Sequence, residues 1–205
     1  MTSPTLPDLP RLPDLVDSHC HLDFPDLVEE TAEIITRARA AGVNRMVTIC
    51  TRLKNEPKVR AMAEAHPEVF YAAGIHPMSA HEEPPVTVDQ LVAFARHPRF
   101  VGIGETGLDY HYTAETKAIQ QTSLRLHIVA AQETGLPLII HARDADEDME
   151  AILSAGMKQK PYTCVMHCFS SGPRLAEAAL EMGFTLSISG IAAFPKSQAL
   201  RDIFA

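Results

Sequence analysis

The sequence predicts a parallel α/β fold, and within that class a (β/α) barrel with about seven of the eight strands of a closed barrel. Two observations support this prediction. Short apolar runs alternate along the chain with amphipathic helical segments, and such runs are typical of strands buried on both faces of a parallel sheet. Polar and ionisable side chains also follow these runs directly, and barrel enzymes carry their sites at the carboxyl ends of their strands.

The elements follow from apolar runs and from the residues that end helices. Each predicted helix before the last is followed by a glycine or a proline, as expected at a helix end. These residues are, in chain order, Gly42, Pro67, Pro98, Gly135, Gly156 and Gly183. The candidate helices are residues 27–40, 55–65, 88–96, 115–134, 146–153, 173–182 and 197–205. The candidate strands are residues 15–17, 46–50, 69–73, 100–103, 137–140, 163–166 and 184–188.

The length of 205 residues is enough for one sizeable core. Residues 1–14 contain prolines at positions 4, 7, 10 and 13, and we expect an extended tail there. Residues 15–205 are expected to form a single barrel domain. Neither a G-x-G-x-x-G after the first strand nor a G-x-x-x-x-G-K-[ST] motif occurs, which disfavours nucleotide-binding doubly wound folds.

The formal net charge of −8 argues against a protein that coats nucleic acid with a broad basic surface. It does not exclude an enzyme that grips one or two phosphates through metal ions. No apolar stretch approaches the ~18 residues of a membrane span, and the first residues do not resemble a secretory signal. The four cysteines do not form a disulfide framework. We therefore expect a cytoplasmic protein with reduced thiols that does not contact a membrane.

The most informative local feature is the pair His19 and His21 at the end of the first apolar run. Residues i and i+2 of a strand point to the same face, so both imidazoles could hold one divalent metal. Two ordinary histidines at a strand end are the alternative.

Similar side chains follow other strands of the predicted barrel. Glu105 lies between glycines after the fourth strand, where a carboxylate could approach a metal closely and bridge a metal pair. His141 follows the fifth strand and His167 the sixth, and His76 follows the third. With His19 and His21, the residues Glu105, His141 and His167 form a candidate ligand set. Two metals about 3.5–4 Å apart clamp the oxygens that attack and leave in a hydrolysis.

Five segments of the chain closely resemble the TatD family of metal-dependent deoxyribonucleases, within the amidohydrolase superfamily. They are residues 15–23, 74–77, 104–110, 137–144 and 167–171. The resemblance implies a TIM-type (β/α) barrel with a binuclear divalent-metal site, and 3′ to 5′ exonuclease action on single-stranded DNA or RNA ends.

The resemblance also implies roles for individual residues. One metal is held by His19 and His21, the other by His141 and His167, and Glu105 bridges them. His76 and Arg143 are expected near the scissile phosphate, so that the expected catalytic residues are Glu105, His76 and Arg143. Asp109 and Tyr110 match the family segment without an assigned role. The ions are expected to be Zn²⁺, Mn²⁺ or Mg²⁺, and histidine ligands favour zinc or manganese over magnesium.

One departure from the family pattern concerns the end of the chain. The family carries a Glu-Thr-Asp-x-Pro type motif after its last strand, whose aspartate binds metal, and this sequence has no counterpart. We expect a barrel truncated after about seven strands, from a truncated gene or a natural short paralogue. Such a chain is expected to be less active and less soluble than one with an eighth unit. A complete barrel is expected to be a monomer, whereas open strand edges invite association.

Two other functions stay open at this point. A related metal site could hydrolyse a small ester, lactone or amide. The chain could also be a catalytically impaired metal-binding fragment. The amount of metal bound per chain and the activity on a single-stranded oligonucleotide distinguish these two functions from that of a nuclease.

Overall fold

Seven parallel strands form one sheet in the computed structural model, which describes residues 14–205. The predicted tail therefore lies, apart from Asp14, outside the described residues. Each strand pairs with the strand that follows it in the chain, in the order β1-β2-β3-β4-β5-β6-β7. The strands are β1 (Leu15–Cys20), β2 (Val43–Cys50), β3 (Val69–Ala73), β4 (Phe100–Asp109), β5 (Leu138–Arg143), β6 (Cys164–Met166) and β7 (Thr185–Leu186).

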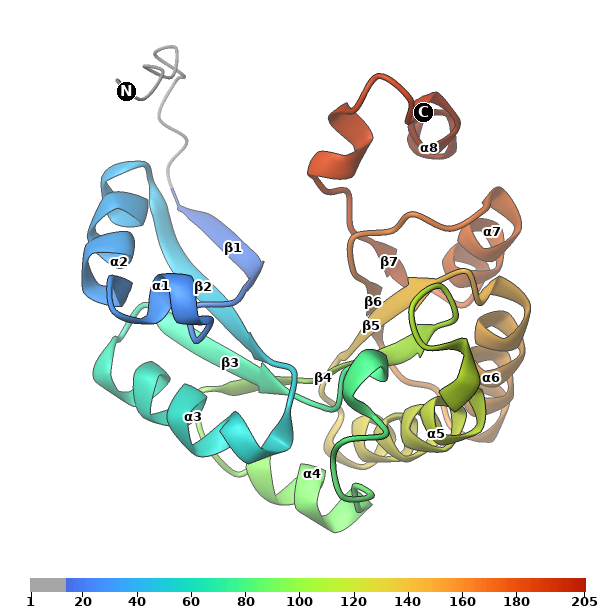
Figure 1. The fold of residues 1–205 in the computed structure, drawn as a ribbon, viewed down its shortest axis with the longest axis horizontal. Coiled ribbons are helices and arrows are strands. Elements are labelled where there is room, and N and C mark those ends of the chain that lie inside the picture. The colour runs from blue at the N-terminus through green and yellow to red at the C-terminus, as the bar shows by residue number, and fades with distance from the viewer. Residues whose placement is uncertain (1–13) are drawn as a thin grey trace.

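Helices cover the outer face of this sheet, and the sheet curls into a half-barrel (Figure 1). Each connection between consecutive strands carries at least one helix or helical turn. The α-helices are α1 (Pro25–Val28), α2 (Thr31–Ala40), α3 (Glu56–Ala65), α4 (Val88–Phe94), α5 (Lys117–Thr134), α6 (Asp146–Gln159), α7 (Pro173–Glu181) and α8 (Gln198–Phe204). The 3₁₀ turns are η1 (Leu53–Asn55), η2 (Pro77–Ser79), η3 (Ala114–Thr116) and η4 (Gly190–Ala193). The predicted TIM-type barrel with seven strands is confirmed.

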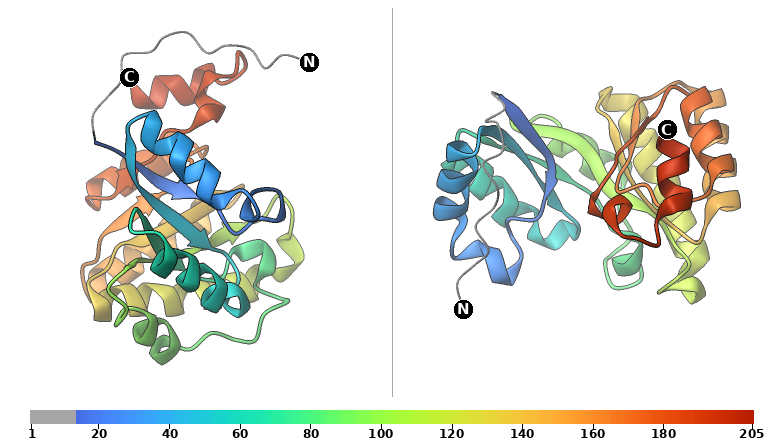
Figure 2. Two further views of the ribbon diagram at one scale, coloured as in Figure 1. Left: turned by 90° about the vertical axis from the view of Figure 1, so that its left-hand side faces the viewer. Right: turned by 90° about the horizontal axis from the view of Figure 1, so that it is seen from above.

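The sheet is open between its first and last strands. β1 and β7 stand at the two ends of the strand order, and Figures 1 and 2 show the ribbon open between them. Apolar side chains at these ends face solvent, since Val16 is 53% exposed and Ile188 is 61% exposed. Association through these edges stays a prediction. None of the helices within residues 14–205 has the length and apolarity needed to cross a bilayer.

The strands that carry the candidate site are longer than predicted. Glu105 lies inside β4 and His141 inside β5, whereas the sequence placed both residues after their strands. The reason is that parallel pairing continues beyond the apolar runs, with Thr106 beside Ile140 and Gly107 beside His141. The backbone of a strand holds both side chains, which makes their positions better defined than those of loop residues.

Two helix predictions are wrong in detail. The segment predicted as one helix over residues 27–40 forms two helices, α1 and α2. The helix predicted to end near Gly156 runs through it to Gln159. Gly156 is inside α6 because the helix packs closely there, and a Cβ atom at this position would lie 2.9 Å from Cγ2 of Ile128. Glycine at that position serves packing between helices, not helix termination.

The core lies on both faces of the sheet. A large cluster of buried side chains fills the space between the strands and the helices, with Tyr71, Leu124 and Met149 among its fully buried members. A small second cluster consists of Ile49, Ala72 and Ile139. Because successive strand residues point to opposite faces, Ile49 belongs to the small cluster while its neighbour Cys50 belongs to the large one.

His127 of α5 is fully buried and joins the helix to the loop after β3. Its Nδ1 donates to the backbone oxygen of Ser123 over 2.8 Å, and its Nε2 accepts from the backbone N–H of Ile75 over 3.1 Å. This pattern requires the neutral imidazole with its proton on Nδ1. Burial lowers the pKa of His127 to about 4, although its hydrogen bond to Ser123 opposes the shift.

We expect His127 to make the fold less stable in mild acid. An unfolded histidine titrates near pH 6.5, so between pH 6.5 and about 4 the unfolded chain binds a proton that the folded chain excludes. The contribution of neutral His127 to the free energy of unfolding is complete above about pH 6.5. It is lost as the pH falls towards 4, and the total loss is on the order of 3 kcal/mol. Urea unfolding of the wild type and of His127→Gln between pH 7 and pH 4.5 measures it. Equal pH dependence in the two proteins would contradict the assignment.

Candidate metal centre

The carboxylate of Glu105 lies at the centre of a group of histidines from three strands or strand ends. It projects from β4 and is only 3% exposed. One oxygen, Oε2, lies 3.2 Å from Nε2 of His19. The other oxygen, Oε1, lies 3.6 Å from Nε2 of His76 and 3.5 Å from Nδ1 of His141. The two oxygens of Glu105 therefore face different sets of imidazoles.

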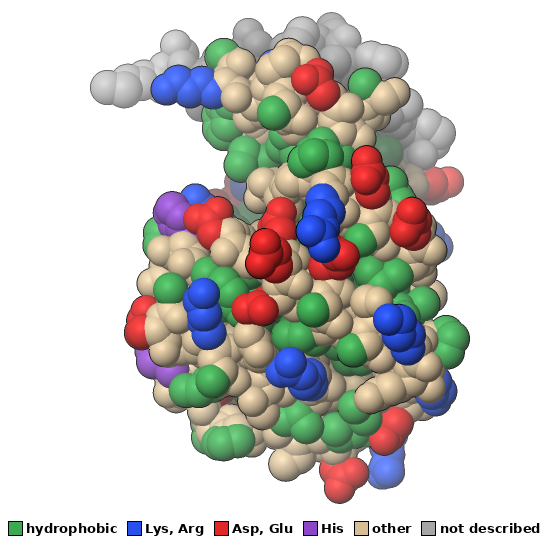
Figure 3. Space-filling view, turned by 90° about the vertical axis from the view of Figure 1, so that its right-hand side faces the viewer, with side chains coloured by type: hydrophobic (Ala, Val, Ile, Leu, Met, Phe, Trp, Pro, Cys, Tyr) green, Lys and Arg blue, Asp and Glu red, His purple; other side chains and the backbone are tan. Residues whose placement is uncertain are grey.

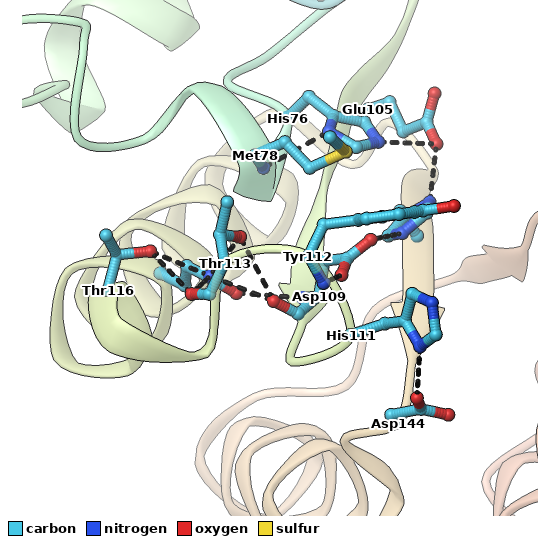
Figure 4. Close-up of polar contacts among 11 residues, drawn as sticks. His76, Met78, Glu105, Asp109, His111, Tyr112, Thr113, Thr116 and Asp144 are labelled. Atoms are coloured by element: carbon cyan, nitrogen blue, oxygen red, sulfur yellow. Dashed lines mark hydrogen bonds and ion pairs between the residues drawn. The ribbon is translucent and has the colours of Figure 1, made fainter.

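Two clusters of candidate metal ligands share Glu105. The first consists of His19, His21 and Glu105, and the second of His76, Glu105 and His141. In each cluster the donor atoms lie within 4.8 Å of one another. In Figure 4 a dashed line links His76 and Glu105, two members of the second cluster. The rings of His19 and His21 lie close together, with centroids 5.1 Å apart, and their role as a ligand pair stays a prediction.

The chemistry of these donors fits a metal ion. Nε2 of His19 is buried without a hydrogen-bond partner among the described residues, although the carboxylate of Glu105 lies 3.2 Å away. An orphaned buried nitrogen is costly in a folded protein. A cation between this nitrogen and the carboxylate would satisfy both groups, and neutral imidazole with carboxylate is an ordinary ligand set for zinc or manganese.

The protonation of the site also suits metal binding. Burial raises the pKa of Glu105, but the nearby imidazoles of His141, His19 and His76 outweigh this and hold it well below its usual range. Burial lowers the pKa of His76 to about 4, and burial likewise lowers the pKa of His21. At neutral pH the carboxylate is therefore ionised, and His76 and His21 are neutral with a lone pair to donate.

Asp109 orients His141. It is fully buried at the end of β4, and its Oδ2 accepts a hydrogen bond from Nε2 of His141 over 2.9 Å. That bond leaves Nδ1 of His141 facing Glu105. Burial lowers the pKa of His141, but its bonds to Glu105 and Asp109 raise it overall. A carboxylate that holds the far nitrogen of a metal-binding histidine is a common arrangement around metal sites.

The sequence contained a signal for Asp109 that the sequence analysis did not use. Glu105, Gly107 and Asp109 alternate along one strand and therefore share a face. Further bonds hold Asp109 in place, because Gln120 of α5 bonds both its backbone N–H and its backbone oxygen. The side chain of Asp109 also accepts from the backbone N–H of Tyr112 over 2.8 Å, a contact visible in Figure 4.

Two predicted site residues lie at the margin of the clusters. His167 follows β6, and its ring stacks on that of His19 with centroids 3.3 Å apart. It belongs to neither ligand cluster within residues 14–205, and its role as a ligand stays a prediction. Arg143 ends β5 and is exposed, with its Cζ atom 4.9 Å from the centre of the Tyr112 ring.

The glycines near Glu105 have a packing role besides the one expected. They were expected to give a metal access to the carboxylate. In the structure they allow neighbouring strands to approach. A Cβ at Gly107, where φ is +143°, would lie 1.9 Å from the backbone oxygen of His141. A Cβ at Gly74 would lie 2.6 Å from Cα of Gly104. Both glycines therefore set the spacing between the strand of Glu105 and its neighbours.

Replacing Asp109 with asparagine is expected to weaken metal binding and activity by about 10- to 100-fold, as for other partners of ligating histidines. The amide has one acceptor where the carboxylate has two, so it cannot accept from both His141 and the N–H of Tyr112. Metal titration of Asp109→Asn beside the wild type measures the loss. Unchanged metal affinity would show that Asp109 does not position His141.

The curled parallel sheet and the cluster of histidines around Glu105 define a metal-dependent hydrolase of the (β/α) barrel class. Residues 16–205 match the family described as TatD related DNase, and the chain belongs to this family.

Individual relatives agree with this assignment. The chain is 37% identical over 193 residues to the uncharacterized metal-dependent hydrolase YcfH of Escherichia coli K12, covering 92% of this chain and 71% of that protein. It is 30% identical over 158 residues to the 3′-5′ ssDNA/RNA exonuclease TatD of Klebsiella pneumoniae, covering 77% of this chain and 60% of that protein. The crystal structure of YjjV, a TatD homologue from Escherichia coli K12, superposes with a TM-score of 0.84 and 28% identity, over 93% of this chain and 73% of that one.

Proposed function

We propose that this metal-dependent hydrolase cleaves phosphodiester bonds in single-stranded DNA or RNA, from the 3′ end, through two divalent ions. The observation that carries this proposal is the position of Glu105, whose two oxygens face two separate histidine clusters. A carboxylate shared in this way is suited to bridge an ion pair. The exonuclease named for the Klebsiella relative supports the choice of substrate.

The residues of the two clusters take distinct roles in this proposal. His19, His21 and Glu105 would hold one ion, and Glu105 with His141 and His76 would hold the other. When bound, such ions supply Lewis acidity towards the phosphate and lower the pKa of water. Asp109 keeps His141 in the tautomer that presents Nδ1 to the site. His76 belongs to the second cluster. We also place it nearest to the scissile phosphate.

In this proposal the nucleic acid contacts the protein at and beside the metal centre, and not over a broad surface. The face shown in Figure 3 carries acidic and basic side chains interspersed over α6 and α7, as in the pair Arg174 and Glu150, with Nε and Oε2 2.9 Å apart. That face resembles an ordinary solvated surface. With the net charge of −8, this supports a nuclease that holds a few phosphates and does not coat a long strand.

Metal content and substrate choice test the proposal together. The purified chain is expected to bind close to two ions, and to shorten a 5′-labelled single-stranded oligonucleotide from its 3′ end faster than it hydrolyses a lactone or a small ester. Preference for the lactone or ester would replace the nuclease by a hydrolase of small molecules. Two bound ions without turnover of any substrate would indicate a metal-binding protein.

Changing Arg143 to lysine is expected to weaken an oligonucleotide substrate more than it weakens metal binding. The guanidinium presents its donors in a planar fork that matches phosphate oxygens, and lysine keeps the charge but loses the fork. Because a charged hydrogen bond contributes about 1.5–3 kcal/mol, we expect KM to rise by roughly 10-fold or more. Steady-state kinetics with metal titration measure both quantities. An unchanged KM would remove Arg143 from the site.

A further inference from the structure

Tyr112 presents an exposed aromatic ring beside the candidate metal centre. Tyr112 is 56% exposed and belongs to neither core cluster. Its backbone N–H is bonded to Asp109, and Asp109 in turn holds His141. The backbone of Tyr112 is therefore linked to the metal centre through a buried carboxylate. In Figure 4, Glu105 and His76 lie on one side of the Tyr112 ring, and His111 and Asp144 lie on the other.

The neighbours of the ring fix its position while leaving part of it open. His111 meets it at 89° with ring centroids 4.6 Å apart. Nδ1 of His111 is in turn 2.8 Å from Oδ2 of Asp144. Arg143 lies with Cζ 4.9 Å from the ring centre. Since more than half of the Tyr112 side chain still faces solvent, a flat ligand has access to the ring.

Arg143 offers a second contact beside the ring. Within residues 14–205, its stacking on Tyr112 is the interaction that its guanidinium makes, so its N–H donors are available to a ligand. Arg143 pairs with Asp109 in the sheet and is two residues after His141. It therefore leaves β5 on the same face as His141, at a spacing of about 7 Å along the strand.

An open cavity adjoins Arg143, and its lining includes Tyr110 but not Tyr112. Arg143 and Lys117 line this cavity of about 650 Å³. The same cavity is lined by the acidic residues Asp144, Asp146, Glu147 and Asp148. A wall of mixed charge does not suit a ligand that is phosphate alone. It suits a ligand that carries hydrogen-bond donors and acceptors together with phosphate, as a nucleotide does.

We propose that Tyr112 and Arg143 form a nucleotide subsite in which a nucleobase stacks on the Tyr112 ring while the guanidinium holds a neighbouring phosphate. This inference rests on the proposed nuclease function and adds to it the part of the substrate that is recognised. Aromatic stacking is tolerant of sequence, because every base has a π-face. The subsite therefore distinguishes a strand that carries bases from a bare phosphodiester, and it does not read which base is present.

Binding of two matched oligonucleotides tests the subsite separately from catalysis. Both are fluorescein-labelled single strands with phosphorothioate linkages that resist cleavage, and one carries abasic tetrahydrofuran residues in place of its bases. Fluorescence anisotropy of the metal-loaded protein measures the two dissociation constants. The wild type is expected to prefer the strand with bases. Tyr112→Ala is expected to reduce this preference by about 10- to 100-fold, as for one lost stack, while the abasic strand binds as before.

Two further variants separate stacking from other effects. Tyr112→Phe keeps the ring and is expected to restore the preference for bases. Phe194→Ala removes another exposed aromatic side chain, 62% exposed and outside the subsite, and is expected to leave the preference unaltered. Thermal unfolding of each variant confirms that it is folded. An equal loss with both oligonucleotides, or no loss, in Tyr112→Ala would overturn the stacking role. A wild type that cleaves DNA without preferring bases would overturn the subsite alone.

Discussion

Glu105→Gln is expected to abolish hydrolysis and to reduce bound metal from about two ions per chain to one or fewer. Both oxygens of Glu105 face imidazoles, one towards His19 and the other towards His76 and His141. An amide has no charge and only one acceptor oxygen, so it bridges two cations poorly. The loss of activity should exceed the roughly 10- to 100-fold that removing an outer hydrogen bond to a metal ligand costs.

Elemental analysis and turnover of the same protein preparation check this result. A thermal melt of the metal-free proteins is the control, because the substitution retains the shape of the side chain and should leave the fold intact. His167→Ala in parallel decides whether the residue stacked on His19 also holds metal. Wild-type turnover and metal content in Glu105→Gln would show that the centre is not binuclear.

Gly107→Ala is expected to have the largest effect on structure. The new Cβ would lie 1.9 Å from the backbone oxygen of His141, at a φ of +143° that an L-residue rarely adopts. Relief requires β4 and β5 to separate where Gly107 pairs with His141. That movement displaces both Glu105 and His141. We expect a loss of more than about 3 kcal/mol in the free energy of unfolding, as for other severe steric mechanisms.

Gly190→Ala is a matched control for this substitution. A Cβ at Gly190 meets no heavy atom within 4 Å, so the same chemical change is expected to cost little. Urea unfolding and metal titration of both variants measure the difference. A Gly107→Ala protein with the stability and metal affinity of Gly190→Ala would show that the spacing of β4 and β5 does not depend on Gly107.

Much of the site was predictable because histidine and glutamate are rare choices beside buried strands. His19 and His21 could be paired from their spacing alone, since a strand places i and i+2 on one face. The bridging role proposed for Glu105 also followed from its position between glycines at a strand end. The role of Asp109 did not, because a buried aspartate at a strand end has many possible partners. Only the register of β4 against β5 brings its Oδ2 to Nε2 of His141.

The barrel class predicted from the sequence implied the strand order, because each strand of a (β/α) barrel pairs with the strand that follows it in the chain. The sequence also determined which residue types gather at the carboxyl edge of the sheet. Only the tertiary structure decided how the donors are grouped. It places His76 with Glu105 and His141, and it stacks His167 on His19. The physical reason is that a local sequence pattern sets only the direction of a side chain. The distance between two side chains on different strands depends on the register and curl of the sheet. Close contacts of glycines, such as Gly107 against His141, control that register and curl.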